Sequence, residues 1–321
     1  MALLAALAGC AGPHPRPPVP PAAPPAPVVV MPKPGYDSLL DRPDSVDASG
    51  LSGRRIAIDP GHGGFFTGAV GVHGLTEKEV NLDVALRLRD LLTAHGAHVL
   101  LTRETDRDFL TPADSSLHAD LAARTAIANA FHPDLFMSIH HNADAGAAHD
   151  VNETQTYYQL GDEGVALDAA QDVHRSLVRN VAIGSGRVIP GNYFVLRTSD
   201  SPGLLTETSY ITYPPTEQRL ATPGAQEIEA EALYVGLARY FARRVPVIET
   251  FTARDPDTGE DTLFARGEPR IAARVRGGFD DVALTVDGAP AEVARRDSSL
   301  TWVPAAPLDD GPHEARIEVR L

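Results

Sequence analysis

The stretch Arg55-Ile56-Ala57-Ile58, followed directly by Asp59-Pro60-Gly61-His62-Gly63-Gly64, decides the fold of this chain. The first four residues form a short apolar run of the kind that makes a buried strand. The proline and the glycines then end the strand, because proline lacks an amide donor and glycine lets the backbone turn sharply. His62 is therefore expected at the carboxyl end of a strand, where open α/β sheets collect their ligands.

Outward from this stretch, strand-like and helix-like segments alternate from Arg54 to about Arg244. The predicted strands are 55–58, 98–102, 135–139, 156–158, 193–196 and 203–206. The predicted helices are 77–95, 117–130, 164–180 and 225–242, the first with Thr76 as its N-cap residue. Such alternation indicates an α/β fold class with a mixed, largely parallel sheet flanked by helices.

The character of the sequence changes after Pro246. Short β-branched runs such as 271–275 and 282–286 alternate as half-buried strands do, and turn signals such as Asp287-Gly288 separate them. We therefore expect an α/β domain over residues 51–245 and a small β-sandwich-like domain, vaguely immunoglobulin-like, over residues 246–321.

The N-terminal residues resemble the signal of a bacterial lipoprotein. Met1 to Ala8 is apolar, and the segment ends Leu7-Ala8-Gly9-Cys10, which is similar to the lipobox in which the thiol is acylated after cleavage. Residues 1–10 are thus interpreted as a lipoprotein signal segment with Cys10 as the lipidation site. No Lys or Arg precedes the apolar run, so the alternative is an apolar N-terminus with an incidental cysteine.

Residues 11–50 are interpreted as a proline-rich linker. Proline fixes φ and removes the amide donor, so the segment favours polyproline II and a spacer role. The formal net charge of −15 argues against a nucleic-acid partner and against a polybasic membrane anchor. With one cysteine there is no intramolecular disulfide, and no apolar run reaches the roughly 18 residues of a membrane-spanning helix.

Four side chains lie where a hydrolytic metal site can be built. His62, His140 and Glu207 each follow a predicted strand, and Glu77 begins a predicted helix. Two imidazoles and one carboxylate can hold Zn²⁺ with a fourth position left for water, whose pKa falls to about 7 on the metal. The remaining carboxylate can take a proton from water and return it to a leaving amine. The pattern indicates amide hydrolysis.

These motifs also carry a family resemblance. Residues 54–242 resemble the zinc-dependent N-acetylmuramoyl-L-alanine amidases of the type-3 family, which cut the amide between N-acetylmuramic acid and L-alanine in peptidoglycan. The resemblance lies in 59–64, 77–78, 81–82, 102–103, Asp106, Arg124, 128–129, 134–136, 138–140, 195–197 and Glu207. It implies zinc ligands His62, Glu77 and His140 and a catalytic Glu207, with residues 51–245 as the catalytic domain. Ser209-Tyr210 departs from the Gly-Phe that the family usually carries.

Further expectations concern location, the helical plug and His141. Ala11-Gly12 offers no aspartate after Cys10, which favours a lipid-anchored protein of the periplasm, at the outer membrane. Residues 143–153 are too few for the long helical plug that some members carry over the zinc. His141 is expected to point away from His140, and the alternative to a ligand role is that it supports the site from behind. The alternatives are a lipid-anchored, non-catalytic peptidoglycan-binding protein and a zinc hydrolase of another amide.

Overall fold

The computed structural model describes residues 32–146, 149–162, 164–184, 186–243, 246–254, 269–277, 279 and 281–320. Cys10, the rest of the expected signal segment and the linker up to residue 31 lie outside these residues. Within the described part of the chain, no helix is both long enough and apolar enough to cross a membrane.

A six-stranded sheet organises the residues between 55 and 210, in the order β2-β1-β3-β6-β4-β5. Its strands are β1 (Arg55–Pro60), β2 (His98–Leu101), β3 (Leu135–Asn142), β4 (Gln155–Gln159), β5 (Arg187–Gly191) and β6 (Gly203–Tyr210). The pairing is parallel except between β4 and β6, which run antiparallel. The mixed, largely parallel sheet predicted from the sequence is confirmed.

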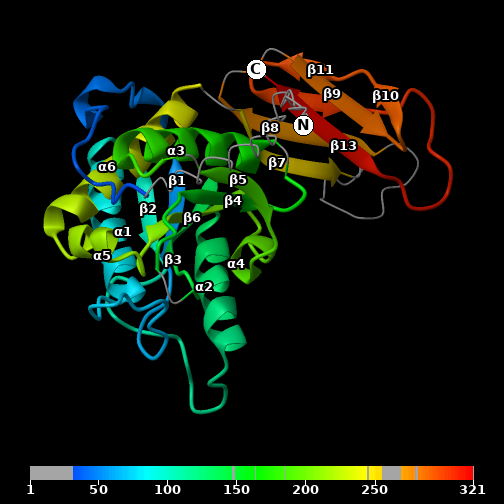
Figure 1. Cartoon of the computed structure of the whole chain (residues 1–321). Coiled ribbons are helices and arrows are strands. Elements are labelled where there is room, and N and C mark those ends of the chain that lie inside the picture. The colour runs from blue at the N-terminus through cyan, green and yellow to red at the C-terminus, as the bar shows by residue number, and fades with distance from the viewer. Residues whose placement is uncertain are drawn as a thin grey trace, which may run out of the picture. The chain divides into compact units, whose positions relative to one another are not determined.

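Helices cover both faces of this sheet (Figure 1). They are α1 (Glu77–Ala94), α2 (Leu117–Phe131), α3 (Val165–Val181), α4 (Phe194–Arg197), α5 (Pro214–Leu220) and α6 (Pro223–Ala242). Ile56 and Ile58 join the larger core with α1, α3 and α6, whereas Ala57 between them packs with α2 and α4. This alternation follows from the two-residue period of a strand, and it makes β1 apolar on both faces.

The start of α1 is fixed by its sequence. Thr76 and Glu79 form a capping box, in which the Thr76 amide donates to the Glu79 carboxylate at 3.3 Å. The helix ends before Gly96, whose φ of 84° stops regular winding. Glu77 is therefore the first helical residue, and its backbone position is set by the cap rather than by a flexible loop.

The predicted strand at 193–196 is wrong, because α4 occupies this place. A four-residue apolar run does not distinguish a strand from a helical turn by its period. In the structure the turn lets both Val195 and Leu196 pack into the core beneath α2. The sequence also gave no indication of β5 or α5.

The end of the predicted linker also differs from expectation. The sequence placed residues up to 50 in a spacer, whereas Tyr36 is only 3% exposed and its amide donates to the Val181 carbonyl at 2.9 Å. A proline has no backbone amide to donate, but its carbonyl can still accept a hydrogen bond. The Tyr213 hydroxyl donates to the Pro32 carbonyl, and the Thr216 hydroxyl donates to the Pro34 carbonyl. Two short 3₁₀ helices, η1 (Pro43–Ser45) and η2 (Ser49–Leu51), complete this packed segment.

The residues after 246 form two small antiparallel sheets, in the orders β10-β9-β13 and β11-β12-β8-β7. Their strands are β7 (Val247–Arg254), β8 (Arg270–Arg276), β9 (Asp281–Val286), β10 (Ala289–Ala291), β11 (Ala294–Arg296), β12 (Ser299–Trp302) and β13 (Ala315–Arg320). Val275 and Leu300 of one sheet share a core with Ile317 of the other. The sandwich-like arrangement agrees with the predicted fold class, and the domain boundary at 246 stays a prediction.

Candidate metal and catalytic site

Three of the predicted site residues meet at the carboxyl ends of the strands. One ligand atom from each of His62, Glu77 and His140 lies within 4.8 Å of the other two. His62 Nε2 is 3.1 Å from Glu77 Oε2, and His140 Nδ1 is 2.9 Å from Glu77 Oε1. The imidazoles of His62 and His140 lie edge to face, with ring centroids 4.9 Å apart. Two nitrogen donors and one oxygen donor therefore converge on one point.

Two glycines make room for this convergence. A Cβ on Gly61 would lie 2.2 Å from the His140 ring. A Cβ on Gly68 would lie 2.4 Å from the Glu77 carboxylate, and its φ of 69° is itself one that L side chains rarely adopt. Any side chain at either glycine would displace a predicted ligand, so the site depends on the close approach of the backbone to His140 and Glu77.

Glu77 is held in place as an anion. It is 3% exposed, and its oxygens accept from the amides of Ala69 at 2.8 Å and His141 at 3.1 Å. Burial raises the pKa of Glu77, but hydrogen bonds to His140 and His62 outweigh it and keep that pKa well below its ordinary value. A carboxylate that stays ionised is the form that coordinates a metal.

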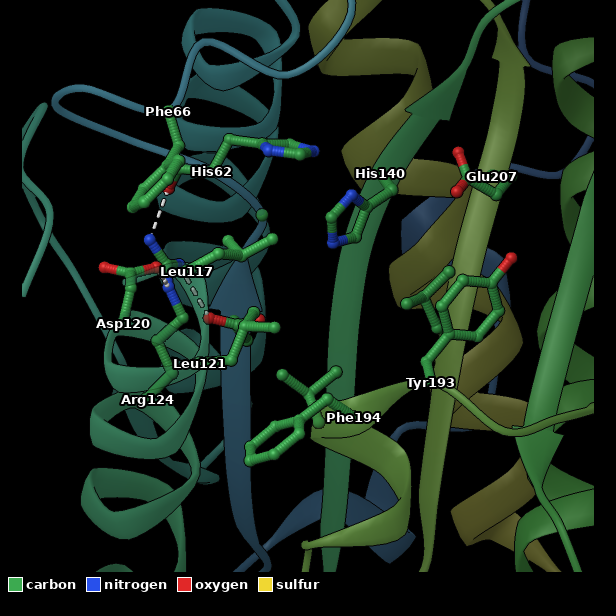
Figure 2. Close-up of a pocket in the computed structure, with 14 residues that line it drawn as sticks. His62, Phe66, Leu117, Asp120, Leu121, Arg124, His140, Tyr193, Phe194 and Glu207 are labelled. Atoms are coloured by element: carbon green, nitrogen blue, oxygen red, sulfur yellow. Dashed lines mark hydrogen bonds and ion pairs between the residues drawn. The ribbon is translucent and has the colours of Figure 1, made fainter. Parts of the chain in front are cut away.

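Glu207 lies beside this group, on the neighbouring strand. It is the register partner of His140 across the parallel pairing of β3 and β6, and it faces the same space as His62 and His140 (Figure 2). Among the described residues, its buried Oε2 is one of the few side-chain atoms without a hydrogen-bond partner. Burial, with the charge of Glu77 nearby, raises the pKa of Glu207 well above its ordinary value. A buried carboxyl of this kind, without a hydrogen-bond partner and beside candidate metal ligands, is a candidate proton carrier.

A cavity of about 290 Å³ opens beside these groups. His62, His140, Glu207 and Tyr193 line it, and Figure 2 shows Phe66, Leu117, Leu121 and Phe194 on its apolar part. Val195 and Leu205 complete the apolar lining. The two histidines of the predicted ligand set thus border a space large enough for part of a substrate, and the unpaired Glu207 carboxyl lines the same space.

A buried ionic cluster beneath the His62 loop had no role assigned from the sequence. Arg124, 1% exposed, pairs with Asp59 at 3.1 Å and Asp120 at 2.7 Å. The same guanidinium donates to the carbonyls of Pro60 at 3.0 Å and His62 at 2.6 Å. Burial raises the pKa of Asp59, but the charge of Arg124 together with His140 and hydrogen bonds from Thr102 and Ser138 outweighs burial and lowers that pKa. The cluster fixes the loop that carries the first predicted ligand.

With this geometry in place, comparison with known proteins decides the family. A sequence model of the N-acetylmuramoyl-L-alanine amidase family matches residues 56–239. The chain belongs to this family.

Relatives of this amidase include the germination-specific N-acetylmuramoyl-L-alanine amidase of Bacillus subtilis (strain 168), 33% identical over 199 residues. That match spans 60% of this chain and 82% of the relative. Among solved structures, the amidase AmiC2 of Nostoc punctiforme is 34% identical with a TM-score of 0.52, spanning 60% of this chain and 99% of that one. The CwlD amidase of Clostridioides difficile, solved with the GerS lipoprotein, is 27% identical with a TM-score of 0.55, spanning 59% and 99%.

The donor set of this amidase fits a zinc ion. Zinc binds imidazole nitrogen and carboxylate oxygen, and catalytic zinc sites combine three protein ligands with one open position. Here His62 and His140 approach the Glu77 carboxylate from two sides, and both imidazoles border the cavity. A metal at this point would therefore be reachable from the space that Glu207 also lines.

His141 lies on the opposite face of β3 from His140, as strand alternation predicts. Its ring is 1% exposed, with Nδ1 2.8 Å from Asn81 Oδ1 and Nε2 3.0 Å from Glu229 Oε2. Burial lowers the pKa of His141, but Glu229 outweighs it and raises that pKa. His141 therefore supports the site from behind in this amidase and does not line the cavity.

Proposed function

We propose that this amidase cleaves the amide between N-acetylmuramic acid and the L-alanine of the peptidoglycan stem peptide, with a zinc ion bound by His62, Glu77 and His140. Membership of the family supports the reaction. The single observation that supports the mechanism is that two of the three convergent donors, His62 and His140, border the same cavity as the unpaired Glu207.

Each side chain has a defined task in this proposal. When bound, zinc supplies a Lewis acid that polarises the scissile carbonyl and acidifies water. Glu207, whose raised pKa suits proton exchange, takes a proton from the attacking water and delivers it to the leaving nitrogen. An amine leaves only when protonated, so one carboxyl serves both steps. The apolar side chains that line the cavity limit the water around the reacting atoms.

The test is digestion of purified sacculi, followed by analysis of the products. We expect free stem peptides with L-alanine at their amino end and glycan strands whose lactyl carboxyls are free. Glu207→Gln protein serves as the matched control, because it keeps the side-chain shape. Release of products cut at another bond would assign the site to a different amide, which is the competing zinc-hydrolase interpretation.

A separate part of the proposal concerns location. Cys10 would be acylated and would hold the enzyme at the periplasmic face of the outer membrane, with the proline-rich segment reaching toward the wall. The sequence Leu7-Ala8-Gly9-Cys10 supports this proposal. Fractionation of cells that express parent and Cys10→Ser protein tests it: only the parent should sediment with membranes. Equal partitioning of the parent and the Cys10→Ser protein would contradict the lipid anchor at Cys10.

A further inference from the structure

We propose that Tyr36, Glu229 and His141 form a buried hydrogen-bonded relay, completed by Asn81, that positions the metal ligand Glu77. The packed segment of residues 32–51, here called the strap, would then be part of the metal site. The inference rests on the metal-binding part of the proposed function and is independent of the substrate.

The outer end of the relay joins the strap to the catalytic domain. Tyr36 donates its hydroxyl to Glu229 Oε2 at 2.8 Å and lies 2.9 Å from Ser209 Oγ. Glu229 and Ser209 are both 0% exposed, and Tyr36 is 3% exposed. Ser209 stands two residues after Glu207, at the place where the sequence departs from the Gly-Phe usual in the family. The strap therefore reaches polar atoms deep inside the molecule.

The middle of the relay is the His141 ring. Its two nitrogens bridge Glu229 Oε2 at 3.0 Å and Asn81 Oδ1 at 2.8 Å. An amide oxygen can only accept, so His141 Nδ1 donates to Asn81. The same Glu229 oxygen thus contacts both Tyr36 and His141, and loss of the Tyr36 hydroxyl would free that oxygen to shift.

The inner end of the relay acts on one oxygen of Glu77. Asn81 Nδ2 donates to Glu77 Oε1 and to the Gly61 carbonyl, both at 3.3 Å, and the His141 amide donates to the same Oε1 at 3.1 Å. This is the Glu77 oxygen that faces His140 at 2.9 Å. Groups that orient a metal ligand typically change metal affinity by about 10- to 100-fold when removed.

Packing alone does not account for the relay. Burying a carboxylate, an imidazole and an amide together costs free energy that apolar residues of similar volume would not. Tyr36 also lies outside residues 56–239, the part that matches the amidase family. A hydrogen-bonded relay from the strap to Glu77 is explained if the relay holds this metal ligand in position.

Zinc affinity of the purified full chain, measured by competition with a chromophoric chelator, tests the relay. We expect Tyr36→Phe to raise the zinc dissociation constant by about 10-fold. Asp37→Asn is the matched strap control, because among the residues that the structure describes Asp37 makes just an exposed ion pair with Arg219 at 2.6 Å. Tyr234→Phe controls for deleting a buried hydroxyl, since that of Tyr234 has no partner among the described residues. Both controls should bind zinc as the parent does.

Glu229→Gln provides a second arm, which still informs if Tyr36→Phe does not fold. Alone it should weaken zinc binding, and combined with Tyr36→Phe it should add little, because both changes break one relay. Parent-like zinc affinity in both single variants, even with lowered thermal stability, would reduce the strap to a structural element. A parent protein that binds no zinc would instead overturn the metal-site proposal.

Discussion

His140 of β3 and Glu207 of β6 are register partners in adjacent parallel strands. Neighbouring strands lie about 4.8 Å apart, so the spacing between this imidazole and this carboxyl is set by backbone hydrogen bonding. Site residues held on strands are positioned more accurately than residues on loops. The proposed metal ligand and the proposed proton carrier are thus kept close, yet on separate backbones.

The ligand set predicts how metal content responds to substitution. His62→Ala and His140→Ala should each abolish stoichiometric zinc, because two remaining donors do not complete a zinc site. Elemental analysis of the purified proteins measures this. His98→Ala, an exposed histidine of β2, should keep one zinc per chain. Full zinc in both ligand variants would place the metal elsewhere.

Glu207→Gln separates metal binding from chemistry. The amide keeps the shape of the side chain but cannot accept a proton, so we expect zinc to be retained and turnover to fall by about 10²-fold or more. Sacculus digestion rates, compared at equal zinc content, give the result. If the variant turns over at the parent rate, another group carries the proton.

The same substitution should change how the stability of the metal-free protein depends on pH. The raised pKa of Glu207 means that the folded state keeps a proton which the unfolded chain has lost. The stabilisation from protonated Glu207 is complete below about pH 4.5, the ordinary pKa of a glutamate. It is lost as the pH rises through the higher pKa of Glu207 in the folded protein. Urea unfolding at pH 5 and pH 8 should show a smaller decline for Glu207→Gln than for the parent. An identical decline in both would show that Glu207 is not the group responsible.

Arg124→Met tests the ionic cluster beneath the His62 loop. Removal of the guanidinium leaves Asp59 and Asp120 buried without their cation, and the free energy of unfolding should fall by about 3–5 kcal/mol. Arg42→Met is the control: its pair with Asp44 is exposed, and no measurable loss is expected. Chemical denaturation of the two variants provides the comparison, and equal stabilities would contradict the role given to Arg124.

The connection between β3 and β4 predicts activity without an activator. Its described residues, 143–146 and 149–154, contain no helix that could cover the cavity. The purified chain should therefore cleave sacculi at the same rate with and without cell extract. Cleavage that appears only when extract is added would reveal inhibition from another part of the chain.

Much of this architecture could be predicted from local patterns. The period of Val80, Val84 and Leu88 and the cap at Thr76 predicted α1, and the helix spans Glu77–Ala94. The brief run 193–196 was assigned wrongly because a strand and one helical turn look alike at that length.

Contacts between distant residues were harder to predict. Tyr36 and Glu229 contact each other across 193 positions, and no local periodicity reports such a pairing. Arg124 and Asp59 are recognisable in the sequence as motif residues, but the sequence did not predict their ion pair. The two residues meet only in the folded chain.

The separation between Tyr36 and Glu229 also orders events during synthesis. A ribosome that adds about 5–20 residues per second needs roughly 10–40 s to make the chain between these two residues. During that interval the strap has been made, but the helix that holds its buried partner has not. A nascent chain therefore lacks the complete support of Glu77. The strap is synthesised early, but it can pack against Glu229 only after α6 has been made.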